Sequence, residues 1–395
     1  MSGSTQMGVA AEVAGTGNGP SYGRLLGLSW AHFLNDGVAN YLPGVLPAVL
    51  IAMGLPVSFG GVLMAALLVG QGVQPLIGIV CDRVGGRAFV IAGLAGSSLC
   101  GALVGFAPSA WTLIPLLIVI GLSSSMFHPQ ALVAIRGLAG RRHGSAMSIF
   151  LVGGEIGRGL WPVLASWVVT VAGLPFLWVL GVPAVLTLIA MPMFVPRVPP
   201  RRSDAARIRW RTHLKPLGVL VAFSALRSLL VIAISTFVPL RWHAMGGSLT
   251  TGATFIATLL VVGIIGNLAG GRLSDRMGRR RLVIGGMTLG VGTLVLFMFA
   301  GGLWSWMLIG LAGIFLFATF PLTILMGQDL VPENPSFGSG VALGFANALG
   351  ALGMIVLGPV AGAWNSTTAL WVAVGCGAVA AALAVRLPRD GGPQH

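Results

Sequence analysis

The chain is 395 residues long, 56% of its residues are hydrophobic, 8% are charged, and its mean hydropathy is +0.93. Soluble globular domains carry about 25% charged residues, so this chain has too few charges to cover the surface of a soluble protein of its size. The composition excludes an ordinary soluble enzyme, a disordered protein and a typical nucleic-acid-binding protein. It indicates a protein dissolved mainly in lipid.

The formal charge is +14, and all Lys and Arg positions except Lys215 are arginines. On a soluble chain this charge would suggest nucleic acid, but the arginines form short clusters between apolar runs, as in cytoplasmic loops of membrane proteins. We therefore expect the protein to contact the lipid bilayer and not to bind nucleic acid. The cysteines, Cys81, Cys100 and Cys376, are scattered, and their spacing predicts no disulfide, metal site or cofactor attachment.

Residues 1–21 have no basic start and no apolar stretch, so the sequence predicts a disordered cytoplasmic tail rather than a secretory signal. Twelve apolar runs follow, each long enough, at about 20 residues, to cross a bilayer as a helix. The runs cover about 25–52, 57–80, 88–107, 111–135, 144–169, 175–195, 216–240, 250–271, 282–301, 304–327, 337–362 and 366–386.

The connections between the runs are short except for residues 196–215, which hold seven basic residues and one acidic residue. This segment predicts a basic cytoplasmic linker between an N-terminal six-helix bundle at 22–195 and a C-terminal six-helix bundle at 216–388, with a cytoplasmic tail at 389–395. The expected fold is an all-α membrane protein of twelve transmembrane helices in two pseudo-symmetric bundles.

The basic residues also predict the orientation. Every basic loop lies on one side of the even-numbered topology, and only Arg241 lies on the other side. Because cytoplasmic loops are enriched in Lys and Arg, we expect both termini in the cytoplasm. The predicted location is the bacterial inner (plasma) membrane, with the chain as a multi-pass monomer.

An internal repeat supports the division into halves. Residues 78–87 read GIVCDRVGGR and residues 271–280 read GRLSDRMGRR, both fitting G-x-x-x-D-R-x-G-x-R at an offset of 193 (271 − 78). HGSAMS at 143–148 parallels FGSGVA at 337–342 at an offset of 194 (337 − 143). The repeat therefore predicts two six-span halves in the same orientation, related by an axis along the membrane normal.

The two repeated loops resemble the signature of the major facilitator superfamily between spans 2 and 3 and between spans 8 and 9. HFLNDGVANYLPGVLP in span 1, FHPQALVAIRGLAGRRHGSAMSIFLVGGEIGRGLWP in spans 4 and 5 and QDLVPENPSFGSGVALGF before span 11 resemble its fosmidomycin-resistance branch. The resemblance implies a drug or organic-anion exporter driven by protons.

Ionisable groups inside the hydrocarbon are costly and usually functional. On span 1, His32, Asn35 and Asp36 form a polar patch, in which His32 and Asp36 share a helix face. We expect this patch to bind substrate or a proton, and the alternative is a structural hydrogen-bonded pair. A metal site is disfavoured because no third or fourth ligand is spaced nearby.

On span 5, Glu155 and Arg158 also share a face, and an ion pair between them lowers the cost of both. We expect Arg158 to bind an anionic substrate group and Glu155 to carry the proton. The alternative is a permanent structural pair. The surrounding glycines, Gly153, Gly154, Gly157 and Gly159, leave room for a ligand or for a closely packed helix.

Three further residues complete the predicted substrate site. Arg227 on span 7 lies at the depth of the span 1 patch by the repeat offset, and its guanidinium suits a phosphonate, phosphate or carboxylate. Its alternative is a salt bridge to Asp36. His128 precedes Pro129 on span 4, where a kink lets it line a cavity or bond to another helix. Asn347 on span 11 is a weaker candidate, since amides often join helices.

The repeated loops are predicted to latch the two halves on the cytoplasmic side. The predicted gate comprises Gly78, Asp82, Arg83, Arg87, Gly271, Asp275, Arg276 and Arg280. Asp329 and Glu333 are possible partners of this latch by position in the span 10–11 loop.

The sequence thus predicts a secondary transporter rather than an enzyme, with a small-molecule substrate, protons as partners and a central cavity near the bilayer midplane. It contains no motif of a soluble enzyme. Proton-coupled efflux of an anionic or amphipathic compound is expected. The alternatives are a proton-coupled uptake permease, an exporter of lipophilic cations, and an intramembrane enzyme or sensor.

Overall fold

A computed structural model describes residues 21–77, 80, 86–138, 143–196, 210–331 and 335–388, and within these ranges the chain is helical with short connections. Residues 1–20 of the predicted N-terminal tail, the predicted tail at 389–395 and residues 197–209 of the predicted linker lie outside the described residues. The last six residues of that predicted linker already belong to a helix, because α10 begins at Trp210.

Within the described residues, each predicted apolar run lies mostly in helix. In the first half the helices are α2 (Tyr22–Asn40), α3 (Leu42–Ala52), α4 (Phe59–Val69), η1 (Gly70–Val73), α6 (Arg87–Leu103), η2 (Val104–Phe106), α7 (Ala110–Leu138), α8 (His143–Ala172), η3 (Leu174–Gly181) and α9 (Val182–Phe194). In the second half they are α10 (Trp210–Ala244), α11 (Leu249–Met277), α12 (Arg279–Phe299), α13 (Leu303–Phe317), α14 (Phe320–Leu330), α15 (Pro335–Gly340), the π-helical η4 (Val341–Phe345), α16 (Ala346–Ala363) and α17 (Ser366–Ala384).

Prolines divide two of the predicted runs. The first run breaks at Tyr41, and Pro43 lies in the first turn of α3. The tenth run breaks after Phe317, and Pro321 lies in the first turn of α14. Proline suits a first turn because the backbone N–H that it lacks has no partner inside the helix there.

Ten helical segments of the described residues are long and apolar enough to cross a membrane. The two predicted runs that are not among these ten are 25–52 and 144–169. They fall on α2–α3, where the break at Tyr41 leaves α3 only 11 residues long, and on α8, which carries Glu155 and Arg158. The two runs outside the ten thus carry His32, Asp36 and Glu155 of the predicted site.

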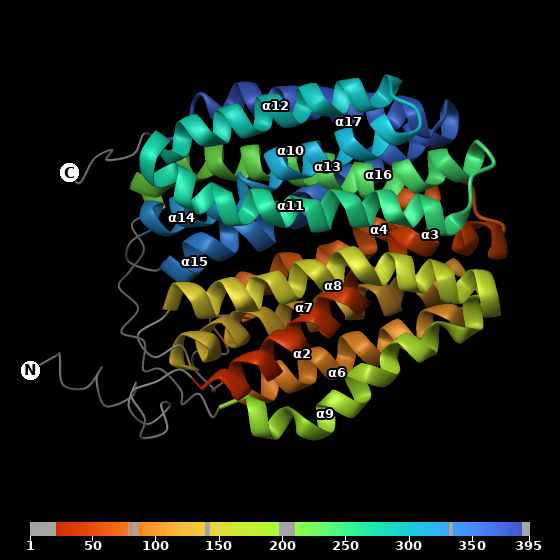
Figure 1. Ribbon diagram of the computed structural model, residues 1–395, viewed down its shortest axis with the longest axis horizontal. Helices are drawn as coiled ribbons and strands as arrows, with labels where there is room; N and C mark the ends of the chain where they lie inside the picture. The colour runs from red at the N-terminus through yellow and green to blue at the C-terminus, as the bar shows by residue number, and fades with distance from the viewer. Residues whose placement is uncertain are drawn as a thin grey trace, which may run out of the picture.

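The helices of each half pack mainly on one another (Figure 1). In the first half α2 packs on α8, α6, α7 and α9, and in the second half α10 packs on α16 and α17, while α13 packs on α11 and α12. The two groups meet where α8 contacts α11, α4 contacts α16, and α3 contacts α10 and α11.

Close helix contacts recur at corresponding positions of the two halves. A Cβ atom on Gly121 of α7 would collide with the carbonyl oxygen of Leu67 on α4, and a Cβ on Gly313 of α13 would collide with that of Leu259 on α11. Both pairs are related by the same offset of 192 (313 − 121 and 259 − 67). Small residues let membrane helices approach this closely.

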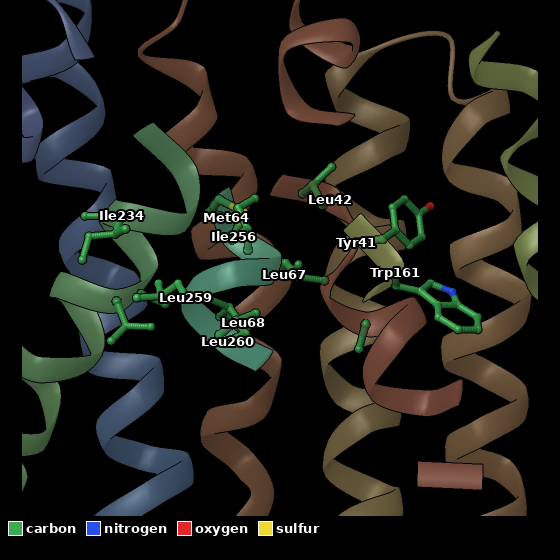
Figure 2. Close-up of a cluster of buried hydrophobic side chains, with 14 of the residues drawn as sticks. Tyr41, Leu42, Met64, Leu67, Leu68, Trp161, Ile234, Ile256, Leu259 and Leu260 are labelled. Carbon is green, nitrogen blue, oxygen red and sulfur yellow. The ribbon is translucent and has the colours of Figure 1, made fainter. Parts of the chain in front are cut away.

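A continuous apolar core runs from one half into the other. Buried side chains of α3, α4, α8, α10 and α11 cluster in this region (Figure 2), among them Leu42, Met64, Leu67, Ile234 and Leu259. In this conformation the two halves are therefore held together by apolar packing where these helices meet.

Candidate functional site

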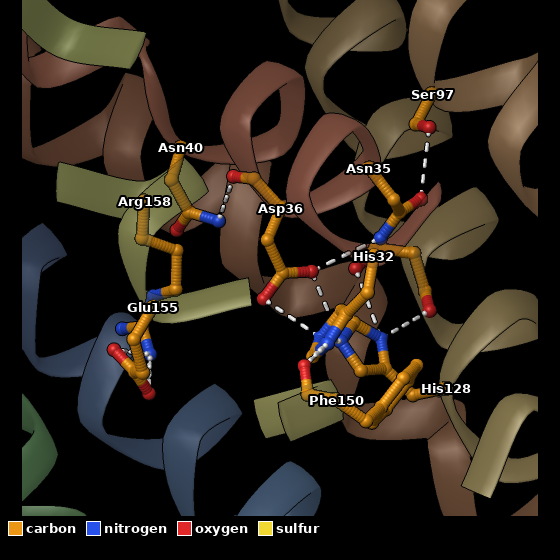
Figure 3. A network of polar contacts seen from close by, with 10 residues as sticks. His32, Asn35, Asp36, Asn40, Ser97, His128, Phe150, Glu155 and Arg158 are labelled. Carbon is orange, nitrogen blue, oxygen red and sulfur yellow. Dashed lines mark hydrogen bonds and ion pairs between the residues drawn. The ribbon is translucent and has the colours of Figure 1, made fainter. Parts of the chain in front are cut away.

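Three titratable side chains from two helices meet inside the first half (Figure 3). His32 and Asp36 lie on α2, and His128 lies on α7. The Nε2 atom of His32 is 3.3 Å from Oδ2 of Asp36, and Nε2 of His128 is 3.0 Å from Oδ1 of Asp36. The two Nε2 atoms are 3.3 Å apart. We call His32, Asp36 and His128 the polar cluster.

Backbone carbonyls hold both imidazoles of the cluster in place. Nδ1 of His32 lies 2.8 Å from the carbonyl oxygen of Phe150 on α8, and Nδ1 of His128 lies 2.8 Å from that of Ser124 on α7. The His32 ring also stacks on the ring of Phe150, with the ring centroids 4.0 Å apart. The side chain of His32 is 4% exposed and that of His128 is 23% exposed, so the cluster opens on the His128 side.

Asn35 connects the cluster to α6. Its side-chain amide donates to Oδ1 of Asp36 at 3.1 Å, and its carbonyl oxygen accepts from the hydroxyl of Ser97 at 3.0 Å. Because Asn35 is fully buried, both polar ends of its side chain are used inside the protein. In this conformation Asn35 positions Asp36.

The predicted pair on α8 forms. Nη1 of Arg158 donates to the two carboxylate oxygens of Glu155 at 3.1 and 3.4 Å, and the side chains are 26% and 15% exposed respectively (Figure 3). The glycines around the pair admit neighbouring helices. Gly153 and Gly157 contact backbone atoms of α2, Gly154 contacts the His32 ring, and Gly159 contacts Val261 of α11.

Arg227 is fully buried in the second half. Its Nη1 donates to the hydroxyls of Thr319 and Thr323 at 3.1 and 3.0 Å, and its guanidinium carbon lies 3.8 Å from the centroid of the Phe320 ring. Nε and Nη2 have no hydrogen-bond partner among the described residues. In the part of the chain that the structure describes, the guanidinium therefore has N–H groups without an acceptor, and no carboxylate neutralises its charge.

The sequence left open a salt bridge between Arg227 and Asp36. Asp36 instead contacts His32, His128 and Asn35. Within the described residues no hydrogen bond or ion pair joins the polar cluster to Arg227. In this conformation the predicted substrate residues are thus divided between the two halves rather than gathered in one set of contacts.

Asn347 joins α16 to α10, because its carbonyl oxygen accepts from the hydroxyl of Ser228 at 2.5 Å. This is the helix-joining contact that the sequence offered as the alternative to substrate binding. Ser228 lies beside Arg227 on α10, so the contact also fixes the rotation of α10 next to the buried guanidinium.

The predicted gate is described only in part. Gly78, Asp82 and Arg83 lie outside the described residues, as does the side chain of Asp275. A Cβ on Gly271 would meet open space, and Arg276 is exposed.

The guanidinium of Arg87 donates to the carbonyl of Pro192, and that of Arg280 donates to the carbonyl of Val385. Arg279 pairs with Asp329, a predicted latch partner. Each of these three contacts lies within one half, so a latch between halves stays a prediction. Glu333, the other predicted partner, lies outside the described residues.

Sequence reasoning missed how these groups are partnered. It placed His128 near a cavity but not against Asp36, and it did not name Thr319 or Thr323. Thr319 and Thr323 are four residues apart, and residues at this spacing share a helix face. This spacing was the signal in the sequence that could have identified them.

The chain is similar to known proteins over nearly its whole length. A model of the Major Facilitator Superfamily matches residues 28–356. The chain is 26% identical over 386 residues to the uncharacterized MFS-type transporter YfnC of Bacillus subtilis, covering 93% of each chain. It is 27% identical over 366 residues to the fosmidomycin resistance protein of Escherichia coli, covering 86% of this chain and 87% of that protein.

The fold is similar to that of a solved transporter. A bacterial homologue of the human lysosomal transporter Spinster, in an inward-facing and occupied conformation, aligns with a TM-score of 0.77 at 16% identity and covers 92% of this chain and 95% of its own. Together with the match over residues 28–356 and the helices long enough to span a membrane, this places the chain among multi-pass membrane proteins, and it belongs to the Major Facilitator Superfamily.

Proposed function

We propose that this chain exports a small anionic or amphipathic compound, such as a phosphonate-type drug, in exchange for protons. Twelve spans in two six-helix bundles would carry out alternating access. The recurrence of the Gly121 and Gly313 contacts at one offset supports two related halves. The similarity to a fosmidomycin resistance protein supports efflux. We place the chain as a monomer in a bacterial inner membrane with both termini in the cytoplasm.

The observation that carries the choice of an anionic substrate is the buried guanidinium of Arg227. A buried charge without a counter-charge is strongly unfavourable. Among the described residues, Arg227 has two hydroxyl partners, and its Nε and Nη2 have none. An anionic oxygen would supply both the missing charge and the missing acceptors, since a guanidinium binds phosphonate or carboxylate through two parallel hydrogen bonds.

The proton is assigned to the Glu155–Arg158 pair. The two side chains are partly exposed and bonded only to each other among the described residues. An anion that binds Arg158 would deprive Glu155 of its counter-charge. Because an unpaired carboxylate in a poorly solvated site favours its protonated form, Glu155 would then take up a proton. Binding of the anion and protonation of Glu155 would thus be coupled. Asp36, the second predicted proton carrier, is bonded to two imidazoles and stays a prediction.

The anion assignment is tested with purified protein in proteoliposomes under an imposed pH gradient, with fosmidomycin and simple organic anions as probes. We expect gradient-driven anion transport to fall at least tenfold in Arg227→Ala. Arg281→Gln is the control because this arginine is exposed, and we expect it to transport normally. Equal transport by wild type and Arg227→Ala would overturn the anion site, and transport of lipophilic cations alone would replace the substrate class.

The coupling assignment is tested separately with Glu155→Gln. We expect this variant to keep anion exchange without a gradient but to lose acceleration by the gradient. Full proton-driven transport by Glu155→Gln would remove Glu155 from the mechanism. The direction is read from the same vesicles and from cells: drug sensitivity on loss of the gene supports efflux, whereas failure to grow on one nutrient would indicate uptake.

A further inference from the structure

The polar cluster presents three acceptor atoms to one point. The carbonyl oxygens of Phe150 and Ser124 can only accept hydrogen bonds, so Nδ1 of His32 and Nδ1 of His128 each carry a hydrogen. In a neutral imidazole the other ring nitrogen then has a lone pair. When both imidazoles are neutral, their Nε2 lone pairs face each other and the Asp36 carboxylate, in a region where His32 and Asp36 are buried.

Such an arrangement needs a proton on one imidazole or a metal ion between the three groups, because buried acceptors that face one another without a donor are costly. The separations are those of a metal site. A tetrahedral ion that binds nitrogen or oxygen at about 2.0–2.1 Å holds its ligand atoms about 3.3 Å apart. The two Nε2 atoms are 3.3 Å apart, and each faces its own oxygen of the Asp36 carboxylate, Nε2 of His32 at 3.3 Å from Oδ2 and Nε2 of His128 at 3.0 Å from Oδ1.

The surroundings of the cluster also match a metal site. Metal-binding histidines usually donate their other ring N–H to a carbonyl or carboxylate, which fixes the tautomer and the ring orientation. Both histidines do so here. The carboxylate is in turn bonded to the Asn35 amide at 3.1 Å. The exposed side of His128 leaves a fourth position open to water or to an anionic oxygen.

We propose that His32, Asp36 and His128 bind one divalent transition-metal ion of the zinc class, with two imidazole nitrogens and one carboxylate as ligands. The sequence disfavoured a metal because no third or fourth ligand is spaced near His32 and Asp36, and the structure brings His128 of α7 into position as a third candidate ligand. All three ligands belong to the first half, so movement of one half against the other leaves the site intact. The proposed ion is resident rather than cargo.

The test is zinc binding by the full-length protein in detergent, purified without a histidine tag and stripped of metal. We expect one zinc ion per chain by isothermal titration, and an affinity at least tenfold lower in His128→Gln and in Asp36→Asn. His243→Gln is the matched control, because this histidine is exposed at the end of α10, and it should bind zinc as wild type does. Zinc binding by wild type no tighter than by His128→Gln would overturn the proposal, and the cluster would then hold protons alone.

A second measurement needs no variant. Cobalt in a tetrahedral site gives far stronger visible absorption than cobalt bound by water and surface groups. We expect the wild-type protein with one equivalent of cobalt to show the strong absorption and to lose it when zinc is added. A weak spectrum typical of six oxygen ligands would overturn the proposal even if the cluster variants fail to fold. Neither measurement uses substrate or a gradient, so failure of the proposed transport activity would leave both results unchanged.

Discussion

Arg87 and Arg280 make the same contact in the two halves of the chain. Each donates from a guanidinium nitrogen to a backbone carbonyl 105 residues further along, Arg87 to Pro192 at the end of α9 and Arg280 to Val385 at the end of α17. Both partners are shifted by the repeat offset of 193 (280 − 87 and 385 − 192). Each arginine thereby ties the start of the third predicted span of its half to the end of the sixth.

These two arginines should contribute equally to stability. A cation at the carbonyl end of an exposed helix is worth about 0.3–1 kcal/mol, so we expect Arg87→Gln and Arg280→Gln each to lower the apparent Tm by about 1–3 °C. The effects should add in the double variant because the contacts lie in different halves. Thermal unfolding in detergent measures this, and Arg281→Gln, an exposed neighbour, should leave the Tm unchanged. A large loss for one arginine and none for the other would show that the contacts are not equivalent.

Replacement of Arg227 by methionine should separate stability from function. Methionine has a similar length and fills the space beside Phe320 without a charge, and apolar replacement of a buried charged group is often neutral or stabilising. We expect the apparent Tm of Arg227→Met to equal or exceed that of wild type, while anion transport is lost. The measurements are thermal unfolding and transport by the same preparation. A strongly destabilised Arg227→Met would mean that the guanidinium is structural.

Gly157 should tolerate no side chain. A Cβ there would collide with the carbonyl oxygen of Phe33 and lie 3.1 Å from the backbone nitrogen of Gly37, and such overpacking costs about 1–3 kcal/mol. We expect Gly157→Ala to lower the apparent Tm and to impair transport by moving α8 away from α2. Gly292→Ala is the control, since a Cβ there meets open space, and it should unfold at or above the wild-type temperature. Equal behaviour of the two variants would contradict the α2–α8 packing.

The Ser228–Asn347 hydrogen bond should be measurable as a coupling between α10 and α16. Hydrogen bonds between membrane helices average about 0.6 kcal/mol in double-mutant cycles. We expect Ser228→Ala and Asn347→Ala each to destabilise the protein, and the double variant to be no worse than the more harmful single variant. Unfolding in detergent and sodium dodecyl sulfate mixtures gives the free energies. Strict additivity would show that Asn347 acts elsewhere, as the substrate-binding alternative requires.

Features that depend on a local pattern of residues could be predicted from the amino-acid sequence. The positions of the helices follow from the apolar runs, because a helix in lipid must satisfy its backbone internally and cover itself with apolar side chains. The His32–Asp36 and Glu155–Arg158 contacts were also predictable, since residues three or four apart share a helix face. The 193-residue repeat predicted related halves, and the Arg87 and Arg280 contacts follow it.

The contacts between groups on different helices could not be predicted in this way and became known from the folded structure. His128 reaches Asp36 across 92 residues of sequence, and Arg227 reaches Thr319 and Thr323 rather than Asp36. The role of the glycines near Glu155 was likewise open until α2 and α11 were seen to pack on them. These outcomes depend on how each helix is rotated about its axis and how closely its neighbours approach. Packing of side chains from many helices sets both, and no local pattern encodes it.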